Sequence, residues 1–192
     1  MTSSADPGEA TPTAHRMANA LVELGITHVV TVPDNTSAVL LEALQGGAQT
    51  SRVRLVFATG EGEAVALAAG LWLGGALPAV LIQNTGLLES GDALRGTLSR
   101  MGAPVLLLIT CRGYQKAREA GVDPRMGIED RSMLVRPDLD SVAHMTEATL
   151  RAWGVPHHSI RDPDELSSLS HAFNQAVQDE RPVAVLLDTA FR

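Results

Sequence analysis

Short, unbroken runs of apolar residues recur along the chain, and segments with the spacing of helices separate them. The clearest runs are PAVLIQN (78–84), PVLLLIT (104–110) and PVAVLLD (182–188). Runs that are apolar throughout, without alternating polar residues, are typical of parallel strands whose two faces are both covered. Strands that alternate with helices in this way predict an α/β domain, with helices packed on both faces of one sheet.

The complete pattern predicts a three-layer α/β/α fold around a six-stranded, mainly parallel sheet. The expected strands are 28–32, 53–57, 78–84, 104–110, 155–160 and 182–188. The expected helices are 12–25, 37–45, 63–73, 89–101, 140–153 and 162–179. Thr11 and Asp162 are of the residue types that cap helix starts, and we expect them to cap the first and the last of these helices. No element is assigned to the long polar segment 111–137.

The composition is that of one globular domain. Of the 192 residues, 45% are apolar and 19% are charged, so the chain is long enough and apolar enough to bury a core. We expect residues 1–12 to form a flexible tail and residues 13–192 to form a single domain. The tail lacks the basic patch and apolar stretch of a signal peptide, and no apolar run is long enough to cross a bilayer.

Charge and cysteine content narrow the partners and the compartment. The net charge of −7 argues against nucleic acid as a partner. Cys111 is the only cysteine, which excludes an intrachain disulfide and fits a cytoplasmic location. We expect it to be a small buried thiol rather than a nucleophile. The six histidines lack the spacing of metal ligands, so no metal site is predicted in this chain.

The stretch ATGEGEAVALAAG (58–70) places two glutamates at the start of a helix built from small residues. It is not a dinucleotide fingerprint, because Val65 stands where the third glycine would be. The positive end of the helix dipole explains one first-turn glutamate. The other lies in small, apolar surroundings, where a carboxylate is suited to sharing a proton. Residue type alone leaves the choice between Glu61 and Glu63 open.

The stretch GEGEAVALAAG (60–70) resembles the N-terminal, pyrimidine-binding domain of thiamine-diphosphate enzymes. In that family a glutamate follows the second strand and a glycine lies nine residues later, which selects Glu61 through Gly70. Further segments are similar to the α-type halves of sulfopyruvate and phosphonopyruvate decarboxylases: TVPDNTSAVLLEAL, LIQNTGL, PVLLLITCRGY and RMGIEDRSML. The chain departs from that pattern at Asn35, where serine is usual, and in LLESGDALRG (87–96). The resemblance begins near residue 13.

The resemblance implies thiamine diphosphate as cofactor and a small anionic 2-oxo acid as substrate. Glu61 would be the catalytic residue, because the family's glutamate hydrogen-bonds a ring nitrogen of the cofactor's aminopyrimidine. The residues implied to bind the cofactor are Glu61, Gly60, Asn84, Thr85 and Gly86. The residues expected to line the substrate pocket are Asn35, Thr36, Gln83, Asn84 and Arg112. Turn formation is a competing explanation for Asn35 and Asn84.

The resemblance also implies a second subunit. The family marks its diphosphate-binding and Mg²⁺-binding half with G-D-G and a later asparagine. Here Gly91-Asp92 is followed by no asparagine before Asn174. We therefore expect a β-type subunit to supply that half in a hetero-oligomer such as α2β2, and we expect this chain to be inactive alone. Two other readings remain open: a subunit of a thiamine-diphosphate-dependent carboligase, and a non-catalytic binding or regulatory module.

Basic residues gather in one segment. Six of the 15 Lys and Arg residues lie between Arg112 and Arg136. Arg112, together with Arg118 or Arg125, is a candidate to bind the second acidic group of a sulfopyruvate-like substrate by forked hydrogen bonds. The competing explanation is a solvated loop in which arginines offset nearby acids. Those acids are Glu119, Asp123, Glu129 and Asp130.

Overall fold

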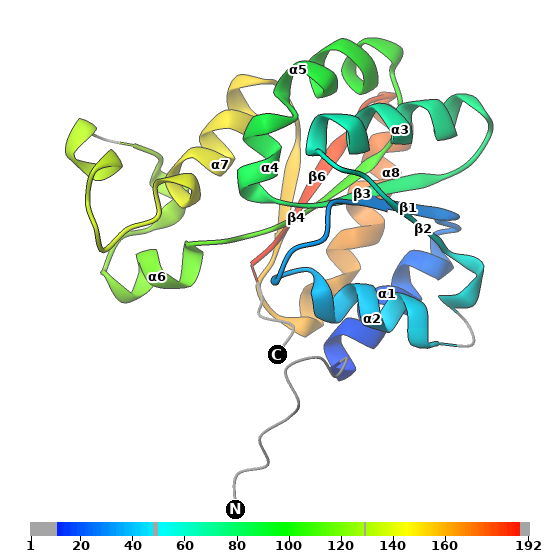
Figure 1. Cartoon of the computed structure of the whole chain (residues 1–192), viewed down its shortest axis with the longest axis horizontal. Coiled ribbons are helices and arrows are strands. Elements are labelled where there is room, and N and C mark those ends of the chain that lie inside the picture. Colours follow the sequence, from blue (N-terminus) through cyan, green and yellow to red (C-terminus); the bar gives the residue numbers. More distant parts are fainter. Residues whose placement is uncertain (1–10, 48–49, 129, 189–192) are drawn as a thin grey trace, which may run out of the picture.

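A six-stranded sheet runs through the centre of the molecule, with every strand parallel to its neighbours (Figure 1). This computed structural model describes residues 11–47, 50–128 and 130–188. The strands are β1 (His28–Thr31), β2 (Arg54–Phe57), β3 (Pro78–Gln83), β4 (Leu106–Thr110), β5 (His157–Ile160) and β6 (Val183–Leu187). Their order across the sheet is β2-β1-β3-β4-β6-β5. The predicted α/β fold class is confirmed.

Helices connect the strands and cover both faces of the sheet (Figure 1). The α-helices are α1 (Pro12–Glu23), α2 (Ala38–Gly46), α3 (Glu61–Leu73), α4 (Asn84–Glu89), α5 (Gly91–Leu94), α6 (Tyr114–Glu119), α7 (Ser141–Ala152) and α8 (Ser167–Asp179). The shorter helical turns are η1 (Thr50–Arg52), η2 (Arg95–Ser99, a π-helix), η3 (Pro124–Met126), η4 (Arg131–Leu134) and η5 (Pro163–Leu166).

Two apolar cores form, one on each face of the sheet. Ala79 and Leu81 of β3 face the core made with α1, α2 and α8, whereas Val80 and Ile82 face the core made with α3, α4 and α7. All four side chains are buried. Full burial of one such aliphatic side chain contributes roughly 1.5–3 kcal/mol. Because both faces are covered, the strands read as continuous apolar runs.

The structure differs from the predicted elements near the candidate site. Helix α3 begins at Glu61 rather than at residue 63, and the predicted helix 89–101 is replaced by α4, α5 and η2. Helix α4 begins at Asn84, immediately after β3, because Asn84 adopts helical geometry instead of ending the strand. The other strand bounds differ from prediction by a residue or two.

Two predicted caps are present, and one has a different role. Thr11 accepts a hydrogen bond from the Ala14 backbone at 3.3 Å, as expected for the cap of α1. Asp162 accepts a hydrogen bond from the Asp164 backbone at 2.9 Å, but it caps the 3-10 turn η5, which precedes α8. The polar segment 111–137 contains α6, η3 and η4, which the sequence pattern did not reveal. The predicted tail lies almost entirely outside the described residues.

Candidate active site

The carboxyl ends of β1, β2, β3 and β4 lie along one edge of the sheet. The chain passes from β1 to β2 on one side and continues through β3 to β4 on the other, so the direction of winding switches between β1 and β3. Open α/β sheets bind ligands outside such a switch point. The predicted site residues Thr36, Glu61 and Gln83 all follow or end strands at this edge.

Glu61 opens α3, and its side chain lies against Gly86 in the first turns of α4. A Cβ atom placed on Gly86 would lie 2.3 Å from both Cγ and Oε1 of Glu61, a separation that real atoms do not show. Gly60, the residue before α3, has an extended backbone. Within the described ranges no group hydrogen-bonds the Glu61 carboxylate. Its oxygens are therefore available to a ligand.

Glu63 has a different role, although it lies only two residues away. The backbone and hydroxyl groups of Thr59 donate to Glu63 Oε2 at 2.8 and 2.7 Å. The hydrogen bond from the Thr59 side chain, followed by that from its backbone, lowers the pKa of Glu63 below the ordinary value. The expectation that the helix start explains one of the two glutamates therefore fits Glu63.

A third glutamate at this helix start was missed by sequence reasoning. Glu89, the last residue of α4, accepts a hydrogen bond from the Gly62 backbone at 2.6 Å. It therefore adds a carboxylate from another helix to the positive end of α3, which also carries Glu63 in its first turn. No spacing in the sequence relates residues 62 and 89, because only the packing of α4 on α3 brings them together.

Five polar residues at the ends of β1, β3 and β4 share hydrogen bonds, and we call them the Asp34 cluster. They are Asp34, Thr36, Gln83, Thr85 and Thr110. The Thr36 and Thr110 hydroxyl oxygens are 2.7 Å apart, and Gln83 Nε2 lies 3.3 Å from both Asp34 Oδ1 and Thr36 Oγ1. Thr85 donates to Gln83 Oε1 at 2.9 Å. The structure thus brings three predicted residues together and adds Asp34 and Thr110, which sequence reasoning missed.

Asp34 also shapes the turn between β1 and α2. Its Oδ1 accepts hydrogen bonds from the backbones of Thr36 at 2.6 Å and Ser37 at 3.2 Å, and from the Thr36 hydroxyl. The Ser37 hydroxyl donates to the Asp34 carbonyl at 3.1 Å. Asn35 is exposed within this turn. The signal that could have identified Asp34 is its place directly after a strand end, in VPDNT (32–36).

Asn84 joins three elements from a fully buried position. Its Nδ2 donates to the Arg112 carbonyl at 3.0 Å and to Thr146 Oγ1 at 3.1 Å. Its Oδ1 accepts from the Arg112 backbone at 3.2 Å. These bonds fix the end of β4 and helix α7 relative to the start of α4. The predicted roles of Asn84 in cofactor and substrate binding stay predictions.

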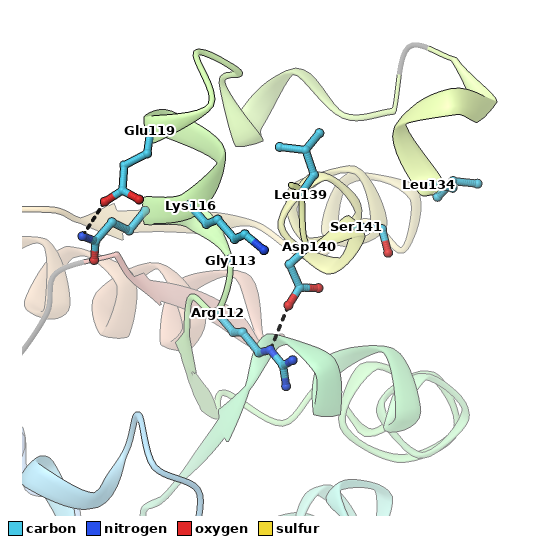
Figure 2. Close-up of a pocket in the computed structure, with 9 residues that line it drawn as sticks. Arg112, Gly113, Lys116, Glu119, Leu134, Leu139, Asp140 and Ser141 are labelled. Atoms are coloured by element: carbon cyan, nitrogen blue, oxygen red, sulfur yellow. Dashed lines mark hydrogen bonds and ion pairs between the residues drawn. The ribbon is translucent and has the colours of Figure 1, made fainter. Parts of the chain in front are cut away.

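Arg112 lies beside an open cavity of about 550 Å³ (Figure 2). Its Nε donates to Asp140 Oδ2 at 2.8 Å, and its side chain remains 57% exposed, so the two terminal nitrogens are accessible to solvent. Lys116 also lines the cavity and lies 3.4 Å from the Pro137 carbonyl. Glu119, on the same helix, accepts from Gln115 at 2.8 Å. The cavity therefore carries two cationic groups and two carboxylates.

The other candidate arginines are paired with carboxylates. Both terminal nitrogens of Arg118 donate to Asp188, at 2.8 and 2.9 Å. Arg125 binds Asp123 through Nε and Nη2, at distances down to 2.6 Å, and the Arg125 side chain holds the pKa of Asp123 down at about 2. The Arg125–Asp123 pair matches the alternative in which loop arginines offset nearby acids, whereas Arg118 is paired with an acid outside that segment.

Cys111 follows β4 and packs, partly buried, against the core. Burial, and secondarily the charge of Asp188, raises the pKa of the Cys111 thiol well above its ordinary value. The thiol therefore stays protonated near neutral pH and is a poor nucleophile.

Comparison with known proteins assigns the family. Residues 12–132 match the model described as "Thiamine pyrophosphate enzyme, N-terminal TPP binding domain". The chain belongs to this family. Thiamine pyrophosphate is the same compound as thiamine diphosphate, so the resemblance noted in the sequence is confirmed.

Relatives of this thiamine pyrophosphate enzyme domain cover from about two thirds to nine tenths of it. It is 26% identical over 173 residues to the sulfopyruvate decarboxylase subunit alpha of Methanococcus maripaludis, covering 90% of this chain and 92% of that protein. It is 31% identical over 140 residues to the phosphonopyruvate decarboxylase of Streptomyces viridochromogenes, covering 69% of this chain but only 34% of that protein. The domain thus spans about a third of the second relative.

Solved structures share its fold. The benzoylformate decarboxylase of Polynucleobacter necessarius superimposes with a TM-score of 0.65 at 20% identity, over 95% of this chain and 30% of that one. In the part of the chain that the structure describes, no helix has the length and apolar character needed to span a membrane.

The residues at the switch point fit thiamine diphosphate. Glu61 offers a carboxylate without a protein partner among the described residues, and Gly86 leaves the space in which that carboxylate lies. Among the same residues, no group of three or more His, Cys, Asp or Glu side chains is arranged to hold a metal ion.

Proposed function

We propose that this chain is the α subunit of a two-chain, thiamine-diphosphate-dependent decarboxylase of 2-oxo acids, with a substrate of the sulfopyruvate or phosphonopyruvate type. The observation that carries the proposal is the Glu61 carboxylate, which lies against Gly86 and has no hydrogen-bond partner among the described residues. The similarity to a sulfopyruvate decarboxylase subunit alpha along nearly its whole length supports the choice of reaction and of subunit.

In this proposal Glu61 is the catalytic residue of the chain. When bound, thiamine diphosphate supplies the electron sink for loss of carbon dioxide from a 2-oxo acid. The Glu61 carboxyl group holds a proton at a ring nitrogen of the cofactor's aminopyrimidine. Gly60, Asn84, Thr85 and Gly86 are assigned to the cofactor site with it, since they flank Glu61 or open the helix against which it packs.

Substrate binding is assigned to polar residues at the same edge of the sheet. Thr36 and Gln83 line this part of the site, where hydrogen bonds within the Asp34 cluster hold them in place. Asn35 is exposed in the adjacent turn. Arg112 supplies positive charge beside the cavity (Figure 2). Its Nε atom bonds Asp140, whereas its two terminal nitrogens make no hydrogen bond to that residue and are accessible to solvent. A guanidinium with two free nitrogens suits a second acidic group on the substrate.

The outer surface of α3 is assigned to the partner subunit. Helix α3 buries Ala64, Val65, Ala68 and Ala69 against the sheet, yet its opposite side also carries apolar residues. An open cavity of about 670 Å³ lies there, lined by residues that include Leu67, Gly70 and Leu71. Phe57 of the edge strand β2 is 55% exposed. Exposed apolar patches of this kind mark protein interfaces. The partner is a β-type subunit that carries the diphosphate and Mg²⁺ site in an assembly such as α2β2.

Co-expression with a β-type chain tests the proposal. The complex and the lone chain are titrated calorimetrically with thiamine diphosphate and Mg²⁺, and decarboxylation of 2-oxo acids is assayed. We expect binding and turnover by the complex only. In Glu61→Gln we expect a loss of turnover of about 100-fold or more with the assembly intact. Unchanged turnover in that variant, or turnover by the lone chain, would contradict the proposal.

A further inference from the structure

The hydrogen bonds of the Asp34 cluster converge on a single oxygen. A carboxylate oxygen can only accept a hydrogen bond, so the Thr36 hydroxyl is the donor in its contact with Asp34 Oδ1. Thr110 must then be the donor in its 2.7 Å contact with Thr36. Four groups therefore donate to Asp34 Oδ1: the Thr36 hydroxyl, the backbone N–H groups of Thr36 and Ser37, and the Gln83 amide.

The second oxygen of the same carboxylate is unused. Asp34 Oδ2 is buried and has no hydrogen-bond partner among the described residues. Buried acceptors are seldom left without a donor, and an unfilled one points to a water, an ion or a ligand. The other buried side-chain atoms without partners belong to Tyr114, His144 and Glu147, which lie in α6 and α7. Asp34 alone among the four lies at the switch point.

The turn into α2 does not account for Oδ2. One side-chain oxygen satisfies the backbone groups of such a turn, and Asn and Ser do so as well as Asp. A carboxylate adds only a second acceptor and a negative charge. No lysine, arginine or histidine forms an ion pair with Asp34 within the described ranges. We therefore expect the donor to Asp34 Oδ2 to come from a group outside the described residues.

We propose that Asp34 is a further binding residue of this site, whose Oδ2 accepts a hydrogen bond from an N–H or O–H group of the bound reactants. This inference rests on the proposed function. Thr36 and Gln83 fix the carboxylate through Oδ1, and Thr110 holds the Thr36 hydroxyl, so that Oδ2 is kept in one place. The donor is either an N–H group of the cofactor or the hydroxyl group that the keto oxygen of the 2-oxo acid becomes when it takes up a proton during the reaction.

The test uses the complex with its β-type partner and the variant Asp34→Asn. Asparagine keeps an oxygen for the Oδ1 hydrogen bonds but puts an amide donor in place of the free acceptor. Asp34→Ser is a second variant that keeps one cap oxygen and removes Oδ2. Asp162→Asn is the matched control, because Asp162 caps η5 at the end of β5. Thermal unfolding of each complex verifies that it is folded.

Two measurements separate the sources of the donor. If the cofactor supplies it, the Kd for thiamine diphosphate with Mg²⁺ rises about 10- to 100-fold in Asp34→Asn. If the substrate supplies it, that Kd is unchanged and kcat/KM falls by a similar factor. Values for both Asp34 variants equal to those of Asp162→Asn would overturn the inference. Absence of cofactor binding and turnover in the wild-type complex would instead overturn the proposed function, and this inference with it.

Discussion

The Glu61 carboxylate occupies the space that a side chain on Gly86 would need, with Oε1 only 2.3 Å from the Cβ position. The two residues are neighbours because α4 follows β3 without a loop. Gly86 thus leaves room for the Glu61 side chain, and a larger residue would force that side chain to move.

We expect Gly86→Ala to displace Glu61 and to lower turnover of the complex by about 100-fold, because small misplacements of a reacting group are costly. The fold itself should lose little stability, because the atoms displaced belong to a flexible side chain. Turnover and urea unfolding measure the two effects. Gly96→Ala is the control, since a Cβ there would meet nothing within 4 Å. Equal turnover in the two variants would show that the Glu61–Gly86 contact has no role.

Asn84→Ala should destabilise the chain even if Asn84 touches no ligand. The substitution leaves the Arg112 backbone groups and the Thr146 hydroxyl without their buried partner. We expect a loss of about 2 kcal/mol and a fall in Tm of about 4–8 °C. Exposed Asn35→Ala provides the comparison and should change stability by less than about 0.5 kcal/mol. A Tm for Asn84→Ala equal to that of Asn35→Ala would argue against these bonds.

Acid should weaken the contribution of Asp123 to stability. Arg125 lowers the pKa of Asp123 from 3.8 to about 2 in the folded chain. The stabilising contribution is therefore complete above pH 3.8 and is lost as the pH falls toward 2. Urea unfolding of the wild type and of Asp123→Asn checks this between pH 6 and pH 2. The difference between the two should shrink across that window, and a constant difference would contradict the ion pair.

Leu67→Glu on the outer side of α3 should weaken association with the β-type subunit. Leu67 is 38% exposed and lines the apolar cavity on that side. A buried charge at an interface core costs well over 1 kcal/mol, so the Kd for the partner should rise at least about 10-fold. Val177→Glu is the control, because Val177 is 48% exposed on α8, which packs on the opposite face of the sheet. Equal losses in both variants would place the interface elsewhere.

The architecture could be read from the sequence because its determinants are local. The run PVLLLIT (104–110) needs cover on both faces wherever it lies, and it forms β4. Glu61 and Gly70 likewise lie in one helix, nine residues apart, so the family's spacing can be recognised from the sequence alone. The early start of α4 was missed because Asn84 and Gly86 more often mark turns than helices.

The missed site residues depend on contacts between distant segments. Asp34 meets Gln83 only because β1 and β3 are neighbours in the sheet, and Glu89 meets Gly62 only through helix packing. The pairing of Arg118 with Asp188 spans 70 residues of chain. No spacing in the sequence encodes such contacts, because they depend on the order of the strands and the packing of the helices.

The direct passage from Gln83 into Asn84 has a consequence for how such a subunit diversifies. There is no loop at this junction to lengthen or shorten, and inserting one residue would turn α4 by about 100° and carry Gly86 away from Glu61. Changes in chain length near the Glu61–Gly86 contact are therefore better tolerated in turns such as 32–37, which lie between elements, than at the junction of β3 and α4.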